Sequence, residues 1–372
     1  MFFFDKSMPR FFKYIMLLLA TIYGGGTALY AQEIKLGADF VTLFDNKEYA
    51  TLKNETSGTL FSARLTPKVG VEWSEGRNEL TFAVDMVQDF GHASKFLSDI
   101  NVQLYYAYKA PRVKLYAGIF PRNAMRGLSS PLFFDRAYTY YNNRIGGVLA
   151  RYEDPNYGDS YVEFAMDYTG MRDFDTREAF MIMTSGRMPI KSIYIGYDLL
   201  VGHYAKDYNP ETIDGVVDNI ILTPYVGFDH SFKTSTLPIN LDIRLSYVQS
   251  LQRDRINENV WKHPFGGELL AEVEWYGVSL SNRLYVGNGP LFTYYDRYGD
   301  ELYHGVPLYC TDKGIYDAIA LSYEQRFFKE TVGIKAGITM EYDGTGWGTR
   351  QWLQVDVALD YGISLKRKKT IE

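Results

Sequence analysis

Charged side chains in this chain occupy positions that suit a water-filled interior. They are Arg64, Lys68, Arg112, Lys114, Asp242, Arg244, Glu268, Glu272 and Arg283, together with Arg122, Arg126 and Arg136. The first nine stand at polar positions of stretches in which polar and apolar residues alternate, and the last three stand in a long joint. An interior of this kind selects solutes by the charge and width of its lining. The alternative is a closed interior held by a network of ion pairs.

The long joint at residues 121–144 combines arginine with aromatic residues. It holds Arg122, Arg126, Arg136 and Arg144 among Phe133, Phe134, Tyr138, Tyr140 and Tyr141. Guanidinium groups bind anionic groups in a bidentate way. We expect this segment to fold partly into the interior and to narrow it, with Asp242, Glu268 and Glu272 as acidic partners. An ordinary packed surface loop is the alternative.

Other chemistry receives little support from residue spacing. The five histidines have no metal-ligand spacing. His203, His263 and His304 stand near Asp207, Asp254 and Asp300, but no nucleophile motif accompanies them. Asp296, Asp300, Glu301 and Asp312 offer oxygen ligands of the kind that calcium prefers, yet their spacing matches no calcium loop. The sequence therefore predicts no metal, no cofactor and no enzymatic activity.

The stretch at residues 352–365 shows what positions the charged side chains. Its apolar parity reads Leu353, Val355, Val357, Leu359, Tyr361, Ile363 and Leu365, and its polar parity includes Gln354, Asp356, Asp360 and Ser364. Successive side chains of a strand point to opposite faces. An ordinary strand has about five or six residues, whereas about ten tilted residues cross a bilayer. This stretch therefore predicts a membrane-spanning strand.

The same alternation recurs along the chain. It is found at residues 34–44, 59–73, 78–90, 100–110, 112–120, 145–153, 160–168, 178–186, 192–204, 219–229, 237–249, 267–275, 278–287, 315–325 and 331–342. Pro224 makes 219–229 the weakest of these, because proline lacks a ladder donor. Long and short joints take turns between the stretches, and aromatic residues gather near their ends. The pattern predicts an all-β, closed antiparallel transmembrane barrel of about sixteen strands in an up-and-down meander.

The termini and the composition bound the remaining possibilities. Basic residues, an apolar run and small residues predict a cleaved signal peptide at residues 1–31, so that one barrel domain fills 32–372, with a basic tail at 366–372. Aromatic residues make up 16 % of the chain, which interfacial girdles would use. The net charge of −6 argues against nucleic acid as a partner. One cysteine, Cys310, excludes an intrachain disulfide.

Several segments resemble an uncharacterised barrel family of Bacteroides-type bacteria, within the porin-like outer-membrane proteins. They are Phe44-Asp-Asn-Lys-Glu-Tyr49, Ser57-Gly-Thr-Leu-Phe61, Tyr116-Ala-Gly-Ile-Phe-Pro-Arg122, Asp214-Gly-Val-Val-Asp-Asn219 and Ser250-Leu-Gln-Arg-Asp-Arg255. The resemblance implies the outer membrane as location, its lipid as partner, and a homotrimer as one arrangement. We expect a channel for passive or weakly selective diffusion of small hydrophilic solutes. A non-conducting surface-binding barrel and a barrel hydrolase are the alternatives.

Overall fold

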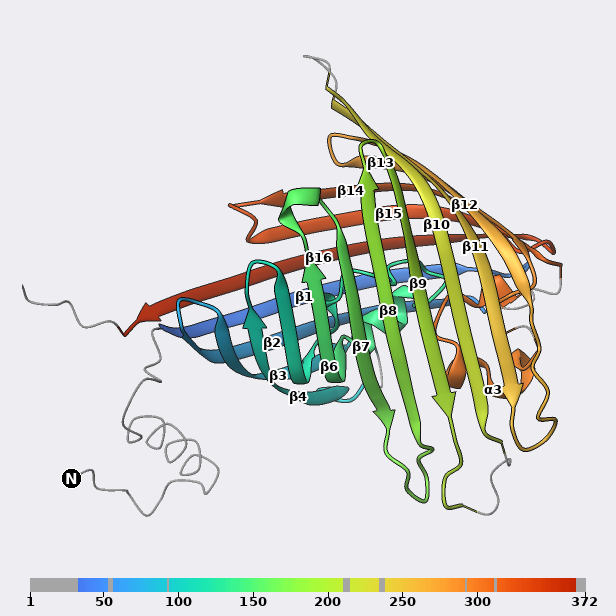
Figure 1. Ribbon diagram of the computed structural model, residues 1–372, viewed down its shortest axis with the longest axis horizontal. Helices are drawn as coiled ribbons and strands as arrows, with labels where there is room; N and C mark the ends of the chain where they lie inside the picture. The colour runs from blue at the N-terminus through green and yellow to red at the C-terminus, as the bar shows by residue number, and fades with distance from the viewer. Residues whose placement is uncertain are drawn as a thin grey trace, which may run out of the picture.

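The structure is a computed structural model that describes residues 33–52, 56–91, 94–209, 215–233, 238–291, 293–310 and 313–365. These residues form one closed barrel in which every strand pairs with its sequence neighbours (Figure 1). All sixteen strand pairs are antiparallel, so the chain is an up-and-down meander. The predicted fold class and strand number are confirmed.

The strands are long enough to cross a bilayer at a tilt. They are β1 (Glu33–Glu48), β2 (Gly58–Trp73), β3 (Asn78–Asp89), β4 (Asp99–Lys109), β5 (Val113–Pro121), β6 (Arg144–Glu153), β7 (Tyr161–Gly170), β8 (Ala179–Ile190), β9 (Ile193–Tyr204), β10 (Val217–Lys233), β11 (Pro238–Asp254), β12 (Phe265–Trp275), β13 (Val278–Gly287), β14 (Ile315–Phe327), β15 (Val332–Tyr342) and β16 (Trp347–Ser364). The short helices are η1 (Arg122–Ala124), α2 (Arg136–Tyr141), η2 (Pro155–Tyr157), α3 (Tyr295–Leu302) and η3 (Pro307–Cys310).

Closure is made by the first and last strands. β1 pairs with β16 from Glu33 opposite Ser364 to Glu48 opposite Thr349, without a register shift. A closed sheet leaves no unpaired edge, which is what a strand structure needs inside lipid. Both ends of the described barrel wall therefore lie at the end with the short turns. The longer joints, including 122–143 and 288–314, lie at the opposite end, which is the extracellular one in barrels of this type.

The apolar and polar residues of the alternating stretches point to opposite faces of the barrel wall, as predicted. Leu353 and Leu359 of β16 point outward and are 45 % and 55 % exposed. Gln354 and Asp356 of the same strand line a cavity inside the barrel. Aromatic rings also contact one another near both strand ends. Phe61 packs against Phe44 and Phe90 at the long-loop end, and Trp73 packs against Tyr106 at the short-turn end.

Pro224 does not interrupt the sheet. β10 runs through it from Val217 to Lys233, and Pro224 lies opposite Tyr197 of β9. On the β11 side, the pairing passes from Leu222 to Tyr225 without a change of register. The strand bounds also differ by a few residues elsewhere, as in β8, which continues to Ile190. Neighbouring strands on both sides hold the proline in place, which the local pattern alone does not reveal.

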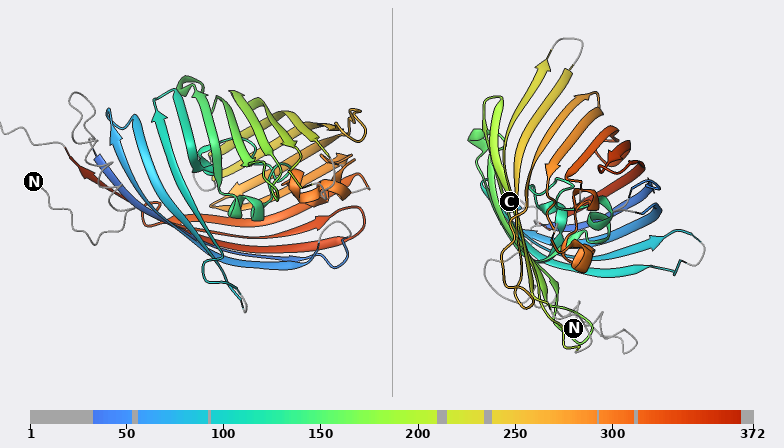
Figure 2. Two further views of the ribbon diagram at one scale, coloured as in Figure 1. Left: turned by 90° about the horizontal axis from the view of Figure 1, so that it is seen from below. Right: turned by 90° about the vertical axis from the view of Figure 1, so that its right-hand side faces the viewer.

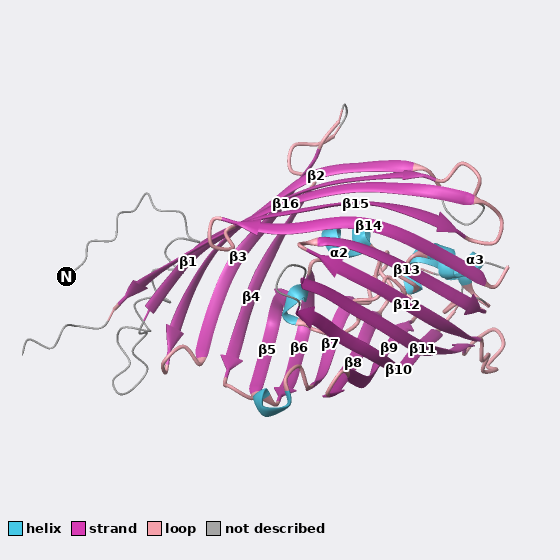
Figure 3. Ribbon diagram, turned by 90° about the horizontal axis from the view of Figure 1, so that it is seen from above, coloured by secondary structure: helices cyan, strands magenta, loops and turns pink. Residues whose placement is uncertain are grey.

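Two joints fold back into the barrel. We call residues 122–143, 288–291 and 293–310 the plug. Figure 3 shows α2 and α3 inside the ring of strands, and Figure 2 shows the same along a second direction. Buried residues of the plug, such as Leu132, Phe133 and Tyr309, form one apolar cluster with wall residues such as Leu149 and Ile221. The prediction that residues 121–144 fold into the lumen agrees with this placement.

Some expectations lie outside the described residues. The predicted signal peptide, residues 1–31, and the basic tail, residues 366–372, belong to segments that the structure does not describe. Among the residues that it does describe, no helix is long and apolar enough to span a membrane.

Leu245 in the middle of β11 tests the outward face. It is 57 % exposed and stands beside the inward Arg244. We expect Leu245→Arg to lower the free energy of unfolding by about 2–4 kcal/mol, because a charge at the lipid midplane is costly. Urea-induced unfolding in phospholipid vesicles, followed by tryptophan fluorescence, measures this. Leu245→Val is the control, and an equal loss in both variants would contradict a lipid-facing position.

Candidate functional site

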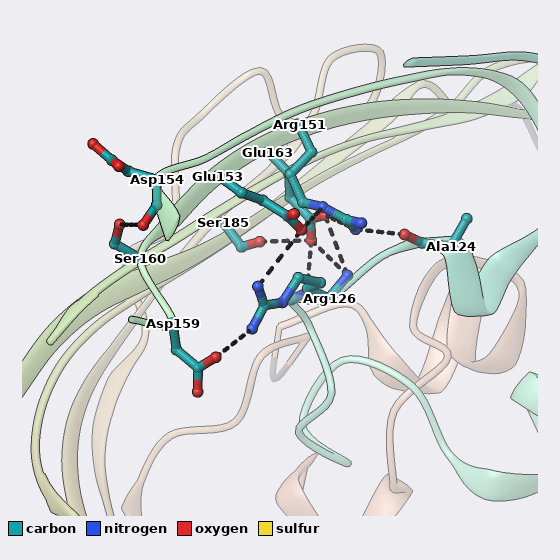
Figure 4. Close-up of polar contacts among 10 residues, drawn as sticks. Ala124, Arg126, Arg151, Glu153, Asp154, Asp159, Ser160, Glu163 and Ser185 are labelled. Atoms are coloured by element: carbon teal, nitrogen blue, oxygen red, sulfur yellow. Dashed lines mark hydrogen bonds and ion pairs between the residues drawn. The ribbon is translucent and has the colours of Figure 1, made fainter. Parts of the chain in front are cut away.

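Glu163 of β7 fastens the beginning of the plug to the wall. Its carboxylate accepts hydrogen bonds from the backbone N–H groups of Arg126 and Gly127, at 3.0 and 2.6 Å, and from the Ser185 hydroxyl at 2.9 Å. Arg151 of β6 lies 3.5 Å away as its cation (Figure 4). A carboxylate with this many charge-assisted hydrogen bonds is held strongly. The loop backbone is thus bound to the wall independently of its side chains.

The next residues continue this attachment. Asp198 of β9 accepts a hydrogen bond from the backbone N–H of Leu128 at 3.1 Å. The Arg126 guanidinium points away from the loop, to 3.2 Å from Asp159 and 3.6 Å from Glu153 (Figure 4). Its charge is therefore directed toward the short-turn end of the lumen.

Arg122 binds the first end of the loop to β7 and to the last residues of the loop. Its Nη2 donates to the Asp167 carboxylate at 2.6 Å, and its Nε donates to the Asn142 carbonyl at 2.8 Å. The guanidinium lies over the rings of Phe134 and Tyr138, at 5.1 and 5.5 Å from their centroids. The two ends of the joint are thus brought together at one buried cation, which is 9 % exposed.

The middle of the joint is attached across the seam between β1 and β16. Arg350 donates from Nη1 to Asp135 at 2.7 Å and from Nε to Asp45 at 2.7 Å. Burial raises the pKa of Asp135, but Arg350 and Lys47 outweigh it and hold the pKa at about 2. Arg136 lies over the Trp352 ring, and burial, followed by the charge of Arg350, lowers its pKa to about 10. Both groups are therefore charged at neutral pH.

The second joint of the plug is attached to the wall at β12. Glu268 of β12 accepts hydrogen bonds from Arg283 and from the Tyr309 hydroxyl, both at 2.6 Å. Arg283 also donates to the Ser130 hydroxyl at 3.2 Å, and Arg244 lies 3.7 Å from Glu268. The sequence placed these three charged residues in the interior. It did not indicate that they contact the plug rather than open space.

The two joints of the plug also bind each other. The backbone N–H of Asp135 donates to the His304 carbonyl at 2.7 Å, and that of Val306 donates to the Pro131 carbonyl at 2.8 Å. The rings of Tyr138 and His304 are stacked at 4.2 Å. Burial raises the pKa of Tyr138 to about 12, so its hydroxyl is neutral. These contacts make the two joints one body inside the lumen.

A chamber of about 790 Å³ lies between the plug and the wall. Its acidic lining residues are Asp39 and Asp356. Its basic lining residues are Arg64, Lys68, Arg122, Arg126, Arg136, Arg326 and Lys335. Five of these seven belong to the predicted pore-lining set. Arg326 was missed because it follows the last clear strand position, although it shares the inward parity of β14.

A second cavity of about 640 Å³ lies on the other side of Arg122. Its lining includes Tyr138, Asp167, Arg177 and Glu301 as well as Arg122 itself. Arg122 therefore borders both cavities. A solute that moves from one to the other along this side of the plug must pass its guanidinium or displace it.

The remaining predicted residues lie at several levels of the wall. Asp242 accepts a hydrogen bond from the Tyr194 hydroxyl at 2.6 Å, and Glu272 accepts one from Ser279 at 2.8 Å. Lys114 lies in β5 opposite Lys109 and Arg151.

Two expectations about the predicted pore-lining residues differ from the structure. Arg112 precedes β5 at a short turn, where its side chain is 52 % exposed, so it does not line the chamber. The arginines of residues 121–144 were expected to pair with Asp242, Glu268 and Glu272. Arg122 and Arg126 instead bind Asp167 and Asp159, because β6 and β7 directly follow the joint and bring their carboxylates beneath it.

The histidine and acidic side chains were also candidates for catalysis or metal binding. His203 bonds to Asp218 at 3.0 Å, not to the nearby Asp207. Ser192 Oγ and His230 Nδ1 are 3.2 Å apart at the short-turn end, beside a cavity of about 300 Å³. Within the described ranges, no group of three or more histidine, cysteine or acidic residues is placed to hold a metal ion.

The chain belongs to the lipid A 3'-O-deacylase-type family, whose model matches residues 27–356. Among solved structures it is similar to a loop-deletion mutant of OmpT, an outer-membrane protein of Vibrio cholerae, with a TM-score of 0.50 at 9 % identity over 88 % of this chain and 99 % of that one. An anion-selective porin from Comamonas acidovorans gives 0.47 at 12 % identity over 88 % and 98 %. No curated protein matches. The protein is thus an outer-membrane barrel of porin-like fold.

The family corrects one expectation. The prediction that this chain is not an enzyme was wrong, because the family to which it belongs is named for an enzyme. That prediction relied on the absence of a nucleophile motif within a short stretch of sequence. In a barrel, strand pairing brings together residues that are far apart in sequence, as with Ser192 and His230, which are 38 positions apart.

Glu163 offers a test of how the plug is held. We expect Glu163→Gln to loosen residues 121–144, because a hydrogen bond to a charged group stabilises by about 1.5–3 kcal/mol. Trypsin should then cleave at Arg126 or Arg136 at least about tenfold faster, since cleavage follows the population of the open form. Glu324→Gln, at an exposed carboxylate paired with Lys335, is the control. Equal cleavage rates in both variants would show that Glu163 does not hold the loop.

Proposed function

We propose that this barrel is a channel for small hydrophilic solutes and that it favours anions. The chamber beside the plug carries the proposal, because seven basic and two acidic side chains line its 790 Å³. A water-filled space with low-dielectric walls and one predominant sign of charge concentrates ions of the opposite sign. Its dimensions suit solutes of the size of small organic anions.

Six of these seven basic side chains form ion pairs, so an anionic solute competes with their carboxylates, whereas Arg136 lies over the Trp352 ring. Lys68 pairs with Asp39 and Asp360, and Arg326 pairs with Asp356. The acidic partners of Arg122 and Arg126 lie on β7 and the turn before it. The chamber is therefore basic on the plug side and mixed on the β1 and β16 side. Such an arrangement places a transverse field across the opening.

Arg122 sets the narrowest point of this route in the proposal, since it borders both cavities. Its bonds to Asp167 and Asn142 hold the guanidinium across the passage. Passage of a solute then requires a small shift of Arg122 or of the plug. The proposed conduction is accordingly low in rate and sensitive to this one side chain.

Conductance of the purified protein in planar bilayers tests the proposal. The triple variant R122S/R126S/R136S should conduct more and shift its selectivity toward cations, because it removes three cations and leaves Asp167, Asp159 and Glu163 in the lumen. Arg112→Ser, at the exposed rim, is the control and should leave both properties unchanged. Absence of channels in well-inserted wild-type protein, or unchanged selectivity in the triple variant, would contradict the proposal.

A second candidate function is hydrolysis of a lipid ester, which membership of a deacylase-type family favours. Ser192 and His230 are a candidate nucleophile and base, since their side chains are 3.2 Å apart. The imidazole would take the hydroxyl proton while Oγ attacks the ester carbonyl. The imidazole would return the proton to the leaving alkoxide. Water would then hydrolyse the acyl ester on Ser192 and release the fatty acid.

Release of fatty acid from a glycerophospholipid by the purified barrel tests this second candidate, because the Ser192–His230 pair lies at the short-turn end, away from the outer leaflet. We expect wild-type protein to release it, and both Ser192→Ala and His230→Gln to release at least about a hundredfold less, because either change removes one half of the nucleophile–base pair. Conductance should be unaffected in both, since the pair lies away from the chamber lining. Activity that persists in both variants would rule out this pair, and no release by wild type would reject the function.

A further inference from the structure

A row of polar and aromatic residues crosses four neighbouring strands on the outer face of the barrel. Phe180 of β8 lies opposite His203 of β9, His203 lies opposite Asp218 of β10, and Asp218 lies opposite Arg253 of β11. Each of these residues has the parity of its strand's lipid-facing side chains, as shown by exposed Met188 of β8, Ile195 of β9, Leu222 of β10 and Leu245 of β11. All four lie at the long-loop end of their strands.

The adjacent outward row is wholly apolar. Ile182, Val201, Ile220 and Leu251 occupy the same four strands two positions toward the middle of the barrel, in the same register. The change from an apolar row to a charged one marks where hydrocarbon gives way to lipid headgroups. At the long-loop end, this is the outer leaflet of the membrane. Charged groups of the row therefore meet headgroups rather than acyl chains.

The row carries more positive than negative charge. Asp218 is its one carboxylate, and it accepts hydrogen bonds from Arg253 at 3.0 Å and from Arg255, just beyond β11, at 2.7 Å. His203 adds a third donor at 3.0 Å. One carboxylate neutralises only one of the two guanidinium groups. Arg255 remains 46 % exposed and Arg253 remains 24 % exposed in their side chains.

Aromatic rings pack against two residues of this group. The Arg253 guanidinium lies over the Trp261 ring, 4.4 Å from its centroid. His203 packs against Phe180 at 4.8 Å between ring centroids. Tryptophan and other aromatic side chains are favoured where membrane and water meet. The side chains are thus held in place on the surface before any ligand arrives.

We propose that Arg253, Arg255 and Trp261 form a binding site for the phosphate-bearing headgroup of an outer-leaflet lipid. The two guanidinium groups bind the phosphate, with Asp218 fixing their orientation from below. The indole ring lies against the saccharide or glycerol part of the headgroup, and the acyl chains follow the apolar row of Val201, Ile220 and Leu251. This site faces away from the lumen, so it depends neither on conduction nor on ester hydrolysis.

Lipid retention measures this site directly. Wild-type protein in detergent is titrated with lipid A carrying its phosphates, and bound lipid is counted by native mass spectrometry. R253S/R255S should bind about thirtyfold more weakly, because each basic residue near an anionic membrane surface contributes about 1 kcal/mol. R253K/R255K should bind with intermediate affinity, since lysine keeps the charge but loses bidentate geometry. Thermal unfolding of each variant verifies that the barrel remains folded.

The control is R112S/K191S, which removes the cations of the β4–β5 turn and the β8–β9 turn at the opposite rim and should leave binding unchanged. Equal binding by wild type and R253S/R255S would overturn the proposal. So would equal affinity for lipid A from which the phosphates have been removed. Inorganic phosphate that displaces the lipid at millimolar concentration would identify a free-anion site and also overturn the assignment to a lipid headgroup.

Discussion

Closure of the hydrogen-bonded sheet is the constraint on which the rest of this structure depends. Inside lipid, each backbone N–H and C=O must find a partner within the protein. The unbroken register between β1 and β16 supplies the last of these partners. Once the sheet is closed, one face of every strand meets lipid and the other meets the lumen. Polar residues are then confined to the lumen and to the two rims.

A segment that fills the lumen in turn needs hydrogen-bond partners on the barrel wall. A loop that enters the barrel brings backbone N–H groups that have no strand to pair with. Carboxylates on the wall accept them: Glu163 binds two consecutive N–H groups and Asp198 binds the next. The burial of Glu163 and Asp198 in the wall is thus explained by the plug. Its aromatic residues find their own partners by packing against each other and against apolar wall residues.

The attachment of the plug leaves an uneven interior. It is fastened to β6, β7 and β9, to β12 and to Arg350 of β16, and the basic chamber remains between these contacts, against β1, β2 and the inner part of β16. One barrel can serve diffusion, lipid chemistry or both, because function depends on sites rather than on fold. The family to which this chain belongs is named for lipid chemistry. The proposed channel uses the chamber, and the proposed headgroup site uses the outer rim.

The sequence by itself determined the class of fold, the approximate strand number and the direction of most side chains. These follow from alternation with a period of two, which is a local property of an extended backbone and is visible within single stretches such as residues 352–365. The lengths of the joints also indicated which end of the barrel bears the longer loops. Local patterns therefore placed Arg64, Arg244 and Glu268 in the interior before any contact was known.

Only the tertiary structure decided which side chains contact each other. Arg283 meets Ser130, 153 positions away, and Arg350 meets Asp45, 305 positions away. Such contacts depend on closure, on strand tilt and on the path of the plug, and none of these leaves a periodic signal. The same holds for Phe180, His203, Asp218 and Arg253, which become neighbours only through the registers of three strand pairs. Side-chain direction is local, but proximity across a barrel is a property of the whole closed sheet.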